Sequence, residues 1–150
     1  MAVTVMIRAA QPADRAAWGA LYAGYAAFYQ VPQTEAMRDT VWGWLMDAGH
    51  QTCGLVACNA DGALIGLAHY RAFARPLSAS TGGFLDDLFV DPDVRGSGAA
   101  DALIAGLRDI GAARGWTVIR WITAEYNYRA RGVYDRVAVR TPWVTYDIKI

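Results

Sequence analysis

The sequence of 150 residues has no excess of charge of either sign. Fourteen basic and fourteen acidic residues give a formal net charge of zero, and Lys149 is the single lysine among the basic ones. A balanced charge argues against the basic surface that dedicated nucleic-acid binders and polybasic membrane anchors use. We therefore expect neither nucleic acid nor a membrane among the partners.

Cysteine and long apolar runs are also scarce. Cys53 and Cys58 are five positions apart, an odd spacing that places them on opposite faces of a strand and predicts no disulfide between them. Together with His50 and His69 they match no zinc-binding spacing, so no metal site is expected. No apolar run reaches the roughly 18 residues of a membrane span, and the first residues lack a long apolar segment. These absences predict a soluble, unexported, cytoplasmic protein.

Hydrophobic residues make up 55% of the chain and charged residues 19%, which predicts a well-filled core. The length favours a single domain over residues 1–150. A polar loop is expected at 75–83. Strands are expected at 3–8, 52–59, 64–73, 84–90, 118–123 and 143–150, and helices from Asp14 (as N-cap) to before Pro32 and at 34–47, 98–114 and 127–137. This order predicts an α/β protein with a mixed sheet and helices on both faces.

Residues 84–104, FLDDLFVDPDVRGSGAADALI, carry the clearest chemical signal. We expect a buried strand, a tight turn permitted by Gly96 and Gly98, and then a helix. The free N–H groups of a first helical turn attract anions, and Arg95 adds a cation beside them. This pattern suits a diphosphate, although a plain strand–turn–helix connection would also use glycines for turning. No Gly-Lys-Ser/Thr follows, which excludes a Walker A loop, and the glycine spacing does not match a dinucleotide-binding fingerprint.

The stretch VDPDVRGSGAADALI resembles the acyl-CoA signature of the GNAT N-acetyltransferase superfamily, R/Q-x-x-G-x-G/A after a strand that ends in Val-x-Pro. Arg95, Gly98 and Ala100 occupy its three specified positions. The pattern is most similar to that of the spermidine/spermine (diamine) acetyltransferases, which carry an acidic pair where Asp86 and Asp87 stand. A second block resembles the N-x-x-A-R-x-x-Y-D segment of the superfamily and matches it at Asn127, Ala130, Arg131, Tyr134 and Asp135.

The resemblance covers essentially the whole chain and implies the GNAT fold, a mixed sheet of six to seven strands with one splayed pair. It implies that the pantetheine arm of acetyl-CoA lies between the splayed strands, with the N–H of Val90 directed at the thioester carbonyl. The pyrophosphate would bind the amides that follow Arg95, and no metal is needed. The implied cofactor-binding residues are Leu88, Phe89, Val90, Arg95, Gly96, Ser97, Gly98, Ala99, Ala100, Asn127, Ala130 and Tyr134.

Tyr134 resembles the general acid of the superfamily, which gives a proton to the departing CoA thiolate. It follows Asn127 by seven residues, so both lie on one face of the same short helix, where Asn127 would bind the pantetheine amide. From the residues alone, the alternative is a tyrosine packed on a helix with its hydroxyl bonded to backbone.

The acceptor amine, with a pKa of about 10, must lose a proton before it attacks. By resemblance Asp86 is the polyamine-contacting position and the candidate base, directly or through water, with Glu125 as a weaker candidate. Strand alternation sends Asp86 and Asp87 to opposite faces, and either one is equally well explained as an exposed or Arg-paired carboxylate. The candidate substrate-binding residues are Tyr25, Tyr29, Asp86, Asp87, Trp121 and Glu125, although an aromatic stripe on a helix is more often core.

The sequence thus predicts an enzyme that moves acetyl from acetyl-CoA to a primary amine of a small molecule by direct attack in a ternary complex. The acceptor is expected to be a diamine, a polyamine or an amino-acid-like compound. Acceptor amines on a protein or an antibiotic, and a non-catalytic acyl-CoA-binding domain, are the alternatives. The segment at 143–150 is apolar enough to cover a partner's sheet, and the resemblance implies a homodimer, which is common in such relatives.

Overall fold

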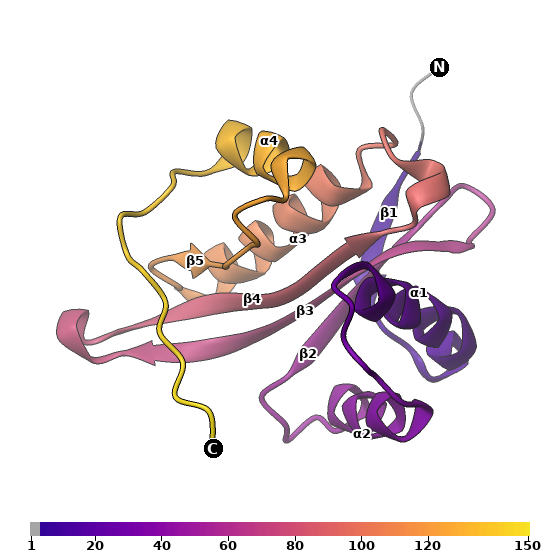
Figure 1. Ribbon diagram of the computed structural model, residues 1–150, viewed down its shortest axis with the longest axis horizontal. Helices are drawn as coiled ribbons and strands as arrows, with labels where there is room; N and C mark the ends of the chain where they lie inside the picture. Colours follow the sequence, from indigo (N-terminus) through magenta and orange to yellow (C-terminus); the bar gives the residue numbers. More distant parts are fainter. Residues whose placement is uncertain (1–3) are drawn as a thin grey trace.

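In a computed structural model, which describes residues 4–150, five strands form one twisted sheet (Figure 1). They lie side by side in chain order; the first four pair antiparallel, and the fifth joins the fourth in parallel. The strands are β1 (Met6–Ala9), β2 (Cys53–Cys58), β3 (Leu64–Arg75), β4 (Ser80–Val90) and β5 (Ile119–Arg120). The sheet is mixed, as expected, but the expectation of six to seven strands was wrong.

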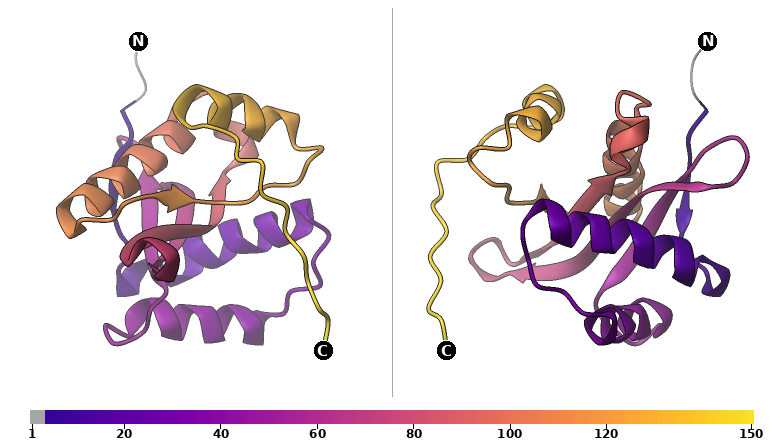
Figure 2. Two further views of the ribbon diagram at one scale, coloured as in Figure 1. Left: turned by 90° about the vertical axis from the view of Figure 1, so that its left-hand side faces the viewer. Right: turned by 45° about the vertical axis from the view of Figure 1, so that its right-hand side comes forward.

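Helices cover both faces of this sheet (Figure 2). They are α1 (Arg15–Phe28), α2 (Glu35–Met46), α3 (Ala99–Arg114) and α4 (Tyr128–Val137). Strand alternation assigns the faces, because the buried Leu67 of β3 packs with Trp18 of α1, whereas its neighbour Ala68 packs with Leu103 and Leu107 of α3. The prediction of helices on both faces is therefore confirmed.

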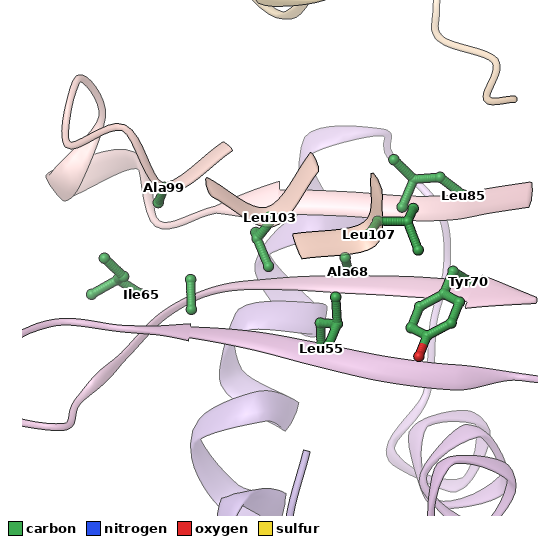
Figure 3. Close-up of a cluster of buried hydrophobic side chains, with 9 residues drawn as sticks. Leu55, Ile65, Ala68, Tyr70, Leu85, Ala99, Leu103 and Leu107 are labelled. Atoms are coloured by element: carbon green, nitrogen blue, oxygen red, sulfur yellow. The ribbon is translucent and has the colours of Figure 1, made fainter. Parts of the chain in front are cut away.

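The larger core cluster lies between the sheet and α3 (Figure 3). Leu103 and Leu107 are four residues apart, so they share one face of α3, and each is 1% exposed. They pack on side chains from three strands, among them Leu55, Tyr70 and Leu85. This packing fixes α3, and with it the loop at its N-terminus, against the sheet.

Local signals set most helix boundaries. Thr34 caps α2 by accepting a hydrogen bond from the Met37 N–H at 3.1 Å, and the helix lies within the expected range 34–47. Gly115 ends α3 in the left-handed region, with φ of +73°. Asp14 stands at the N-cap position of α1, as expected, but its side chain makes no capping hydrogen bond. Its buried carboxylate instead accepts hydrogen bonds from Arg8, at 2.7 and 2.9 Å, and from the Gln11 N–H.

The polar loop expected at 75–83 is mostly strand. β3 runs on to Arg75, a single turn follows at Pro76–Ser78, and β4 begins at Ser80. Two adjacent glycines in this segment lower its apparent strand propensity, yet one of them, Gly83, leaves the space that the Trp116 ring occupies. Packing from elsewhere in the chain therefore overrides the local signal.

The expected C-terminal strand at 143–150 has no partner within residues 4–150. Residues 138–150 belong to no sheet, and the right-hand view of Figure 2 shows this extended segment standing apart from the rest of the domain. The strand expected at 118–123 shortens to β5 because nothing pairs with it on its outer side. The first expected strand covers residues 3–8, and residue 3 lies outside the described residues.

Both cysteines are free, as the spacing predicts. None of the described helices is long and apolar enough to cross a membrane.

Candidate active site

A cavity of about 510 Å³ opens where β4 ends and α3 begins. The end of α1 and one face of α4 complete its wall. It is lined by Tyr25, Phe28, Tyr29, Leu88, Phe89, Val90, Arg95, Gly96, Ser97, Gly98, Ala99, Ala100, Asp101, Asn127, Arg129, Ala130, Val133, Tyr134 and Arg136. One cavity therefore brings together all twelve residues that the sequence assigns to cofactor binding, together with Tyr25 and Tyr29.

β4 and β5 pair only at their start, where Gly83 lies opposite Ile119 and Phe84 opposite Arg120. Beyond these pairs β4 continues to Val90 with no described strand on that side. The two neighbouring strands thus separate beside the cavity.

The backbone of β4 points hydrogen-bonding groups into this separation. Asp91 donates its N–H to the Ile65 carbonyl at 2.8 Å, which fixes that pair as the hydrogen-bonded kind on the β3 side. In an antiparallel ladder such pairs alternate, so Leu88 and Val90 direct their N–H and C=O groups away from β3. These groups can therefore pair with an extended ligand that enters between β4 and β5.

The loop from β4 to α3 forms the opposite end of the cavity. Gly96 and Gly98 both have φ of +83°, a conformation that favours glycine, and an added Cβ at either position would meet no atom within 4 Å. In the part of the chain that the structure describes, the N–H groups of Gly96, Gly98 and Ala100 have no protein acceptor. Unpaired N–H groups at the start of a 16-residue helix, with the exposed Arg95 beside them, suit an anion.

α4 carries the polar groups on the other wall. Asn127 caps this helix, its Oδ1 accepting from the Ala130 N–H at 3.4 Å, and its Nδ2 donates to the Tyr29 hydroxyl at 3.2 Å. Tyr134 lies two turns further on and packs edge-on against Trp121, with ring centroids 5.3 Å apart. Burial, and to a lesser extent the neighbouring Tyr29, raises the pKa of Tyr134 to about 12. Its phenol therefore keeps its proton at neutral pH.

The acidic pair contradicts the expectation from strand alternation. A bulge interrupts the β3–β4 register, so that His69 faces Asp87 while Tyr70 faces Leu85, and Asp86 is the extra residue. As a result, the two carboxylates contact His69 and Arg71, which lie two residues apart on β3 and therefore on the same face of the sheet. Asp87 Oδ2 lies 2.8 Å from His69 Nδ1, and Asp86 Oδ2 lies 3.2 Å from Arg71 Nε.

Asp87 belongs to a buried network that the sequence did not suggest. The indole N–H of Trp18 donates to His69 Nε2 at 2.9 Å, so the imidazole proton must lie on Nδ1, which donates to Asp87. The Tyr22 hydroxyl also donates to Asp87 Oδ2, at 2.9 Å. Burial acts to raise the pKa of Asp87, but the hydrogen bonds from His69 and Tyr22 outweigh it and lower the pKa. The carboxylate is thus held in its charged form.

The pKa of Asp86 shifts in the opposite direction to that of Asp87. Burial raises its pKa, and the charge of Arg71 offsets only part of that rise. The side chains of Asp86 and Arg71 are each one-third exposed. Of the two interpretations that the sequence left open for Asp86, its contacts fit the Arg-paired carboxylate.

The other substrate-binding candidates lie around the cavity rather than in its lining. Asp86 and Asp87 lie on the β4 strand beside it, and Trp121 contacts it through Tyr134. Glu125 is exposed, and its backbone carbonyl, not its carboxylate, accepts a hydrogen bond from Arg131 at 2.7 Å.

The sequence interpretation missed two arginines of the lining, Arg129 and Arg136. Arg136 also approaches Asp101 at 3.4 Å, across from α4 to α3. Helical spacing could have found them, because Ala130, Val133 and Tyr134 share the cavity-facing stripe of α4 and the two arginines flank it. With Arg95 they give the cavity three cations, a set suited to phosphate groups. Among residues 4–150, no three His, Cys, Asp or Glu side chains cluster as a metal site would need.

Comparison with known proteins gives a family match. Residues 18–138 match the family model described as the acetyltransferase (GNAT) family. This range holds the cavity lining, from α1 to α4.

Individual relatives are similar over most of the chain. The D-amino-acid N-acetyltransferase HPA3 of Saccharomyces cerevisiae is 27% identical over 143 residues, 95% of this chain and 89% of the relative. The aminoglycoside N(6′)-acetyltransferase type 1 of Stenotrophomonas maltophilia is 34% identical over 114 residues, 74% of this chain and 66% of the relative. A solved structure of aminoglycoside N-acetyltransferase AAC(6′)-Iy in complex with CoA has the same fold, with a TM-score of 0.80 at 21% identity over 99% of this chain and 97% of that one.

Proposed function

This chain belongs to the acetyltransferase (GNAT) family, and from that premise we propose that it transfers acetyl from acetyl-CoA to a primary amine of a small molecule. The amine attacks the thioester directly in a ternary complex, without a covalent enzyme intermediate. The observation that carries the proposal is the single cavity that joins the unpaired backbone of Leu88 and Val90 to the unpaired amides of the 95–100 loop.

The cavity has two ends that suit the two ends of acetyl-CoA. The diphosphate binds the N–H groups around Gly96 and Gly98, where Arg95 supplies charge. The pantetheine arm lies along Leu88–Val90 and pairs with their free backbone groups as an added strand does. This orientation places the thioester alongside β4.

The chemical step needs a hydrogen-bond donor for the thioester oxygen and a proton donor for the departing sulfur. As the amine nitrogen forms its bond to the thioester carbon, the carbonyl oxygen becomes negative and accepts a hydrogen bond from the Val90 N–H. When the carbon–sulfur bond breaks, the thiolate takes a proton from Tyr134, whose raised pKa of about 12 keeps the phenol protonated at neutral pH. Trp121 positions the Tyr134 ring from behind.

The acceptor amine arrives as an ammonium and must lose one proton before attack. Asp86 is the proposed base, directly or through water, since burial raises its pKa and so makes the carboxylate a stronger proton acceptor. Asp87, already held by His69 and Tyr22, supplies fixed negative charge beside it. Tyr25 and Tyr29 present aromatic faces to the alkylammonium stem.

We favour an amino-acid-like acceptor over a diamine. Arg71 lies 3.2 Å from Asp86, so this edge of the site offers a cation and an anion together, as a zwitterionic acceptor requires. A diamine would instead need two uncompensated carboxylates. The names of the relatives, a D-amino-acid and an aminoglycoside N-acetyltransferase, are consistent with a small-molecule amine. The two free cysteines are consistent with a reducing, cytoplasmic setting.

The test is release of CoA thiol from acetyl-CoA in the presence of a panel of amines: D- and L-amino acids, diamines, polyamines, an aminoglycoside and a peptide with a free N-terminus. We expect amino acids to accelerate thiol release most, with the acetylated amine identified by mass spectrometry. Faster reaction with diamines would overturn the acceptor assignment alone. Binding of acetyl-CoA without acetylation of any amine would overturn the enzymatic proposal.

A further inference from the structure

Two arginines lie on the sheet face that carries Asp86, where β3 and β4 extend beyond α1 and α2 (Figure 1). Arg71 of β3 and Arg120 of β5 are both register partners of Phe84 of β4. Directly opposed residues of neighbouring strands project from the same face of a sheet, so the three side chains form one row. The contact between Arg71 and the Asp86 carboxylate assigns this row to the face where we place the acceptor amine.

Phenylalanine rings support both guanidinium groups. The Arg71 guanidinium carbon lies 4.8 Å from the ring centroid of Phe84. The Arg120 guanidinium carbon lies 5.6 Å from the ring centroid of Phe73, and the two rings meet edge-on with centroids 6.0 Å apart. Gly82 makes room for the Phe73 ring, since a Cβ at that position would lie 2.8 Å from it. An aromatic ring attracts a cation and leaves the N–H groups of that cation free for other partners.

Most donors of the two arginines are unused. Within residues 4–150, Arg120 donates no hydrogen bond and pairs with no carboxylate, although its side chain is only partly exposed. Arg71 bonds to Asp86 through Nε alone, which leaves its two terminal nitrogens without an acceptor in the same part of the chain. Free guanidinium N–H groups bind a carboxylate through short, charge-assisted hydrogen bonds. The row therefore suits a carboxylate next to Asp86.

We propose that Arg71 and Arg120 bind the carboxylate of an amino-acid acceptor, and that Arg120 selects acceptors in which a free carboxylate adjoins the amine. The inference rests on the proposed acetyl transfer and names the acceptor group that this site recognises. Asp86 attracts the ammonium group. Because Arg71 Nε is 3.2 Å from Asp86, a carboxylate on the carbon that bears the ammonium meets the free nitrogens of Arg71. Arg120, on the other side of Phe84 in the row, contacts the same carboxylate.

Other amines fit the row less well. An amide or an ester of an amino acid has the ammonium group for Asp86 but no charge for the two arginines. A diamine would bring a second cation toward Arg71 and Arg120, where like charges repel. The free carboxylate is therefore the feature that this row distinguishes.

The test compares leucine with leucinamide, which lacks the carboxylate. NMR titration of the CoA-saturated protein should show roughly 10- to 100-fold tighter binding of leucine, the contribution of a hydrogen bond between charged groups. The Nε–H signal of Arg120 should shift with leucine only. Arg120→Met keeps a long side chain over Phe73 and removes the charge. It should lower kcat/KM for leucine by the same factor and should not lower kcat/KM for leucinamide.

The comparison is made as a ratio, because the amines of leucine and leucinamide also differ in pKa. The kcat/KM for leucine is divided by that for leucinamide in each protein, so that this difference cancels between the unchanged protein and the variant. Arg114→Met is the matched control. Arg114 also lies over an aromatic ring, that of Trp116 at 5.7 Å, but at the C-terminal end of α3. Its replacement should leave the ratio unchanged.

The outcomes separate this inference from the proposed reaction. Acetylation of both amines with an equal ratio in Arg120→Met and the unchanged protein would overturn the carboxylate site and leave acetyl transfer standing. Tighter binding of leucine without acetylation of either amine would overturn acetyl transfer and support the carboxylate site. An equal fall of the ratio in Arg114→Met would show that position in the row is irrelevant and overturn the inference. If Arg120→Met does not fold, an Arg120 Nε–H signal that saturating leucine leaves unmoved overturns it.

Discussion

Replacing Gly98 by alanine separates two roles of that residue, its backbone conformation and its place in the cavity. Gly98 has φ of +83°, and an added methyl group meets no atom within 4 Å. The folded protein therefore pays only the left-handed penalty, about 1–2 kcal/mol for a residue with a Cβ. For a chain of this length, this corresponds to a fall in melting temperature of roughly 2–8 °C.

Acetyl-CoA binding should suffer more than stability does. The methyl group projects beside N–H groups that we assign to the diphosphate, and a hydrogen bond to a charged group contributes about 1.5–3 kcal/mol. The loss of one such bond raises the dissociation constant roughly 10- to 100-fold, since 1.4 kcal/mol is a factor of ten. Isothermal titration calorimetry with acetyl-CoA measures this change, at a temperature where both proteins are folded.

Gly62→Ala is the matched control. Gly62 lies in the turn between β2 and β3, outside the cavity lining, with φ of +84° and equally open surroundings. It should lose the same stability as Gly98→Ala and bind acetyl-CoA as the unchanged protein does. Equal affinities of the two variants for acetyl-CoA would refute the assignment of the N–H groups around Gly98 to the diphosphate.

Three further predictions concern the cavity wall and the buried network. Tyr134→Phe should lower kcat about 10²- to 10⁴-fold, the usual contribution of a general acid, with little change in acetyl-CoA affinity. Tyr128→Phe, at an exposed position on the same helix, should leave kcat unchanged. An unchanged kcat in Tyr134→Phe would show that Tyr134 is not the general acid. Trp18→Phe leaves Nε2 of the buried His69 without a donor and should lower the free energy of unfolding by about 1–3 kcal/mol in urea titrations, whereas a change within error would mean the bond contributes nothing. The pKa of Asp87 is lowered in the folded state, so the charged carboxylate stabilises the fold above the unfolded pKa of about 3.9, and this stabilisation is lost as the pH falls through the lower folded pKa. Asp87→Asn should therefore lose less of its free energy of unfolding than the unchanged protein does below a pH of about 4. An unchanged dependence of the free energy of unfolding on pH in this range would contradict the prediction.

Local chemistry made much of the fold and the cavity predictable. Thr34 and Gly115 mark helix ends because caps depend on neighbouring backbone alone. The 95–100 loop and the Asn127–Tyr134 spacing were recognisable because each depends on a few consecutive residues. Their meeting in one cavity follows from the order of the elements.

The remaining features depend on contacts between distant parts of the chain. The bulge at Asp86 reversed the expected separation of the two carboxylates, and nothing in a strand of alternating residues announces such a bulge. Trp18 and His69 are 51 positions apart, so no local period could pair them. Residues 143–150 have a clear strand pattern, but a strand needs a neighbouring strand, and within residues 4–150 the chain supplies none for this segment.

The exchange rate of the Val90 amide proton, measured by NMR with and without saturating acetyl-CoA, tests most directly whether the cofactor arm lies between β4 and β5. Val90 directs its N–H away from β3 and into the separation between β4 and β5. We predict fast exchange in the free protein and slow exchange in the complex, while the Phe89 N–H, which pairs with β3, is slow in both. Saturated binding that leaves the Val90 rate unchanged would contradict the claim that the cofactor arm lies between these strands.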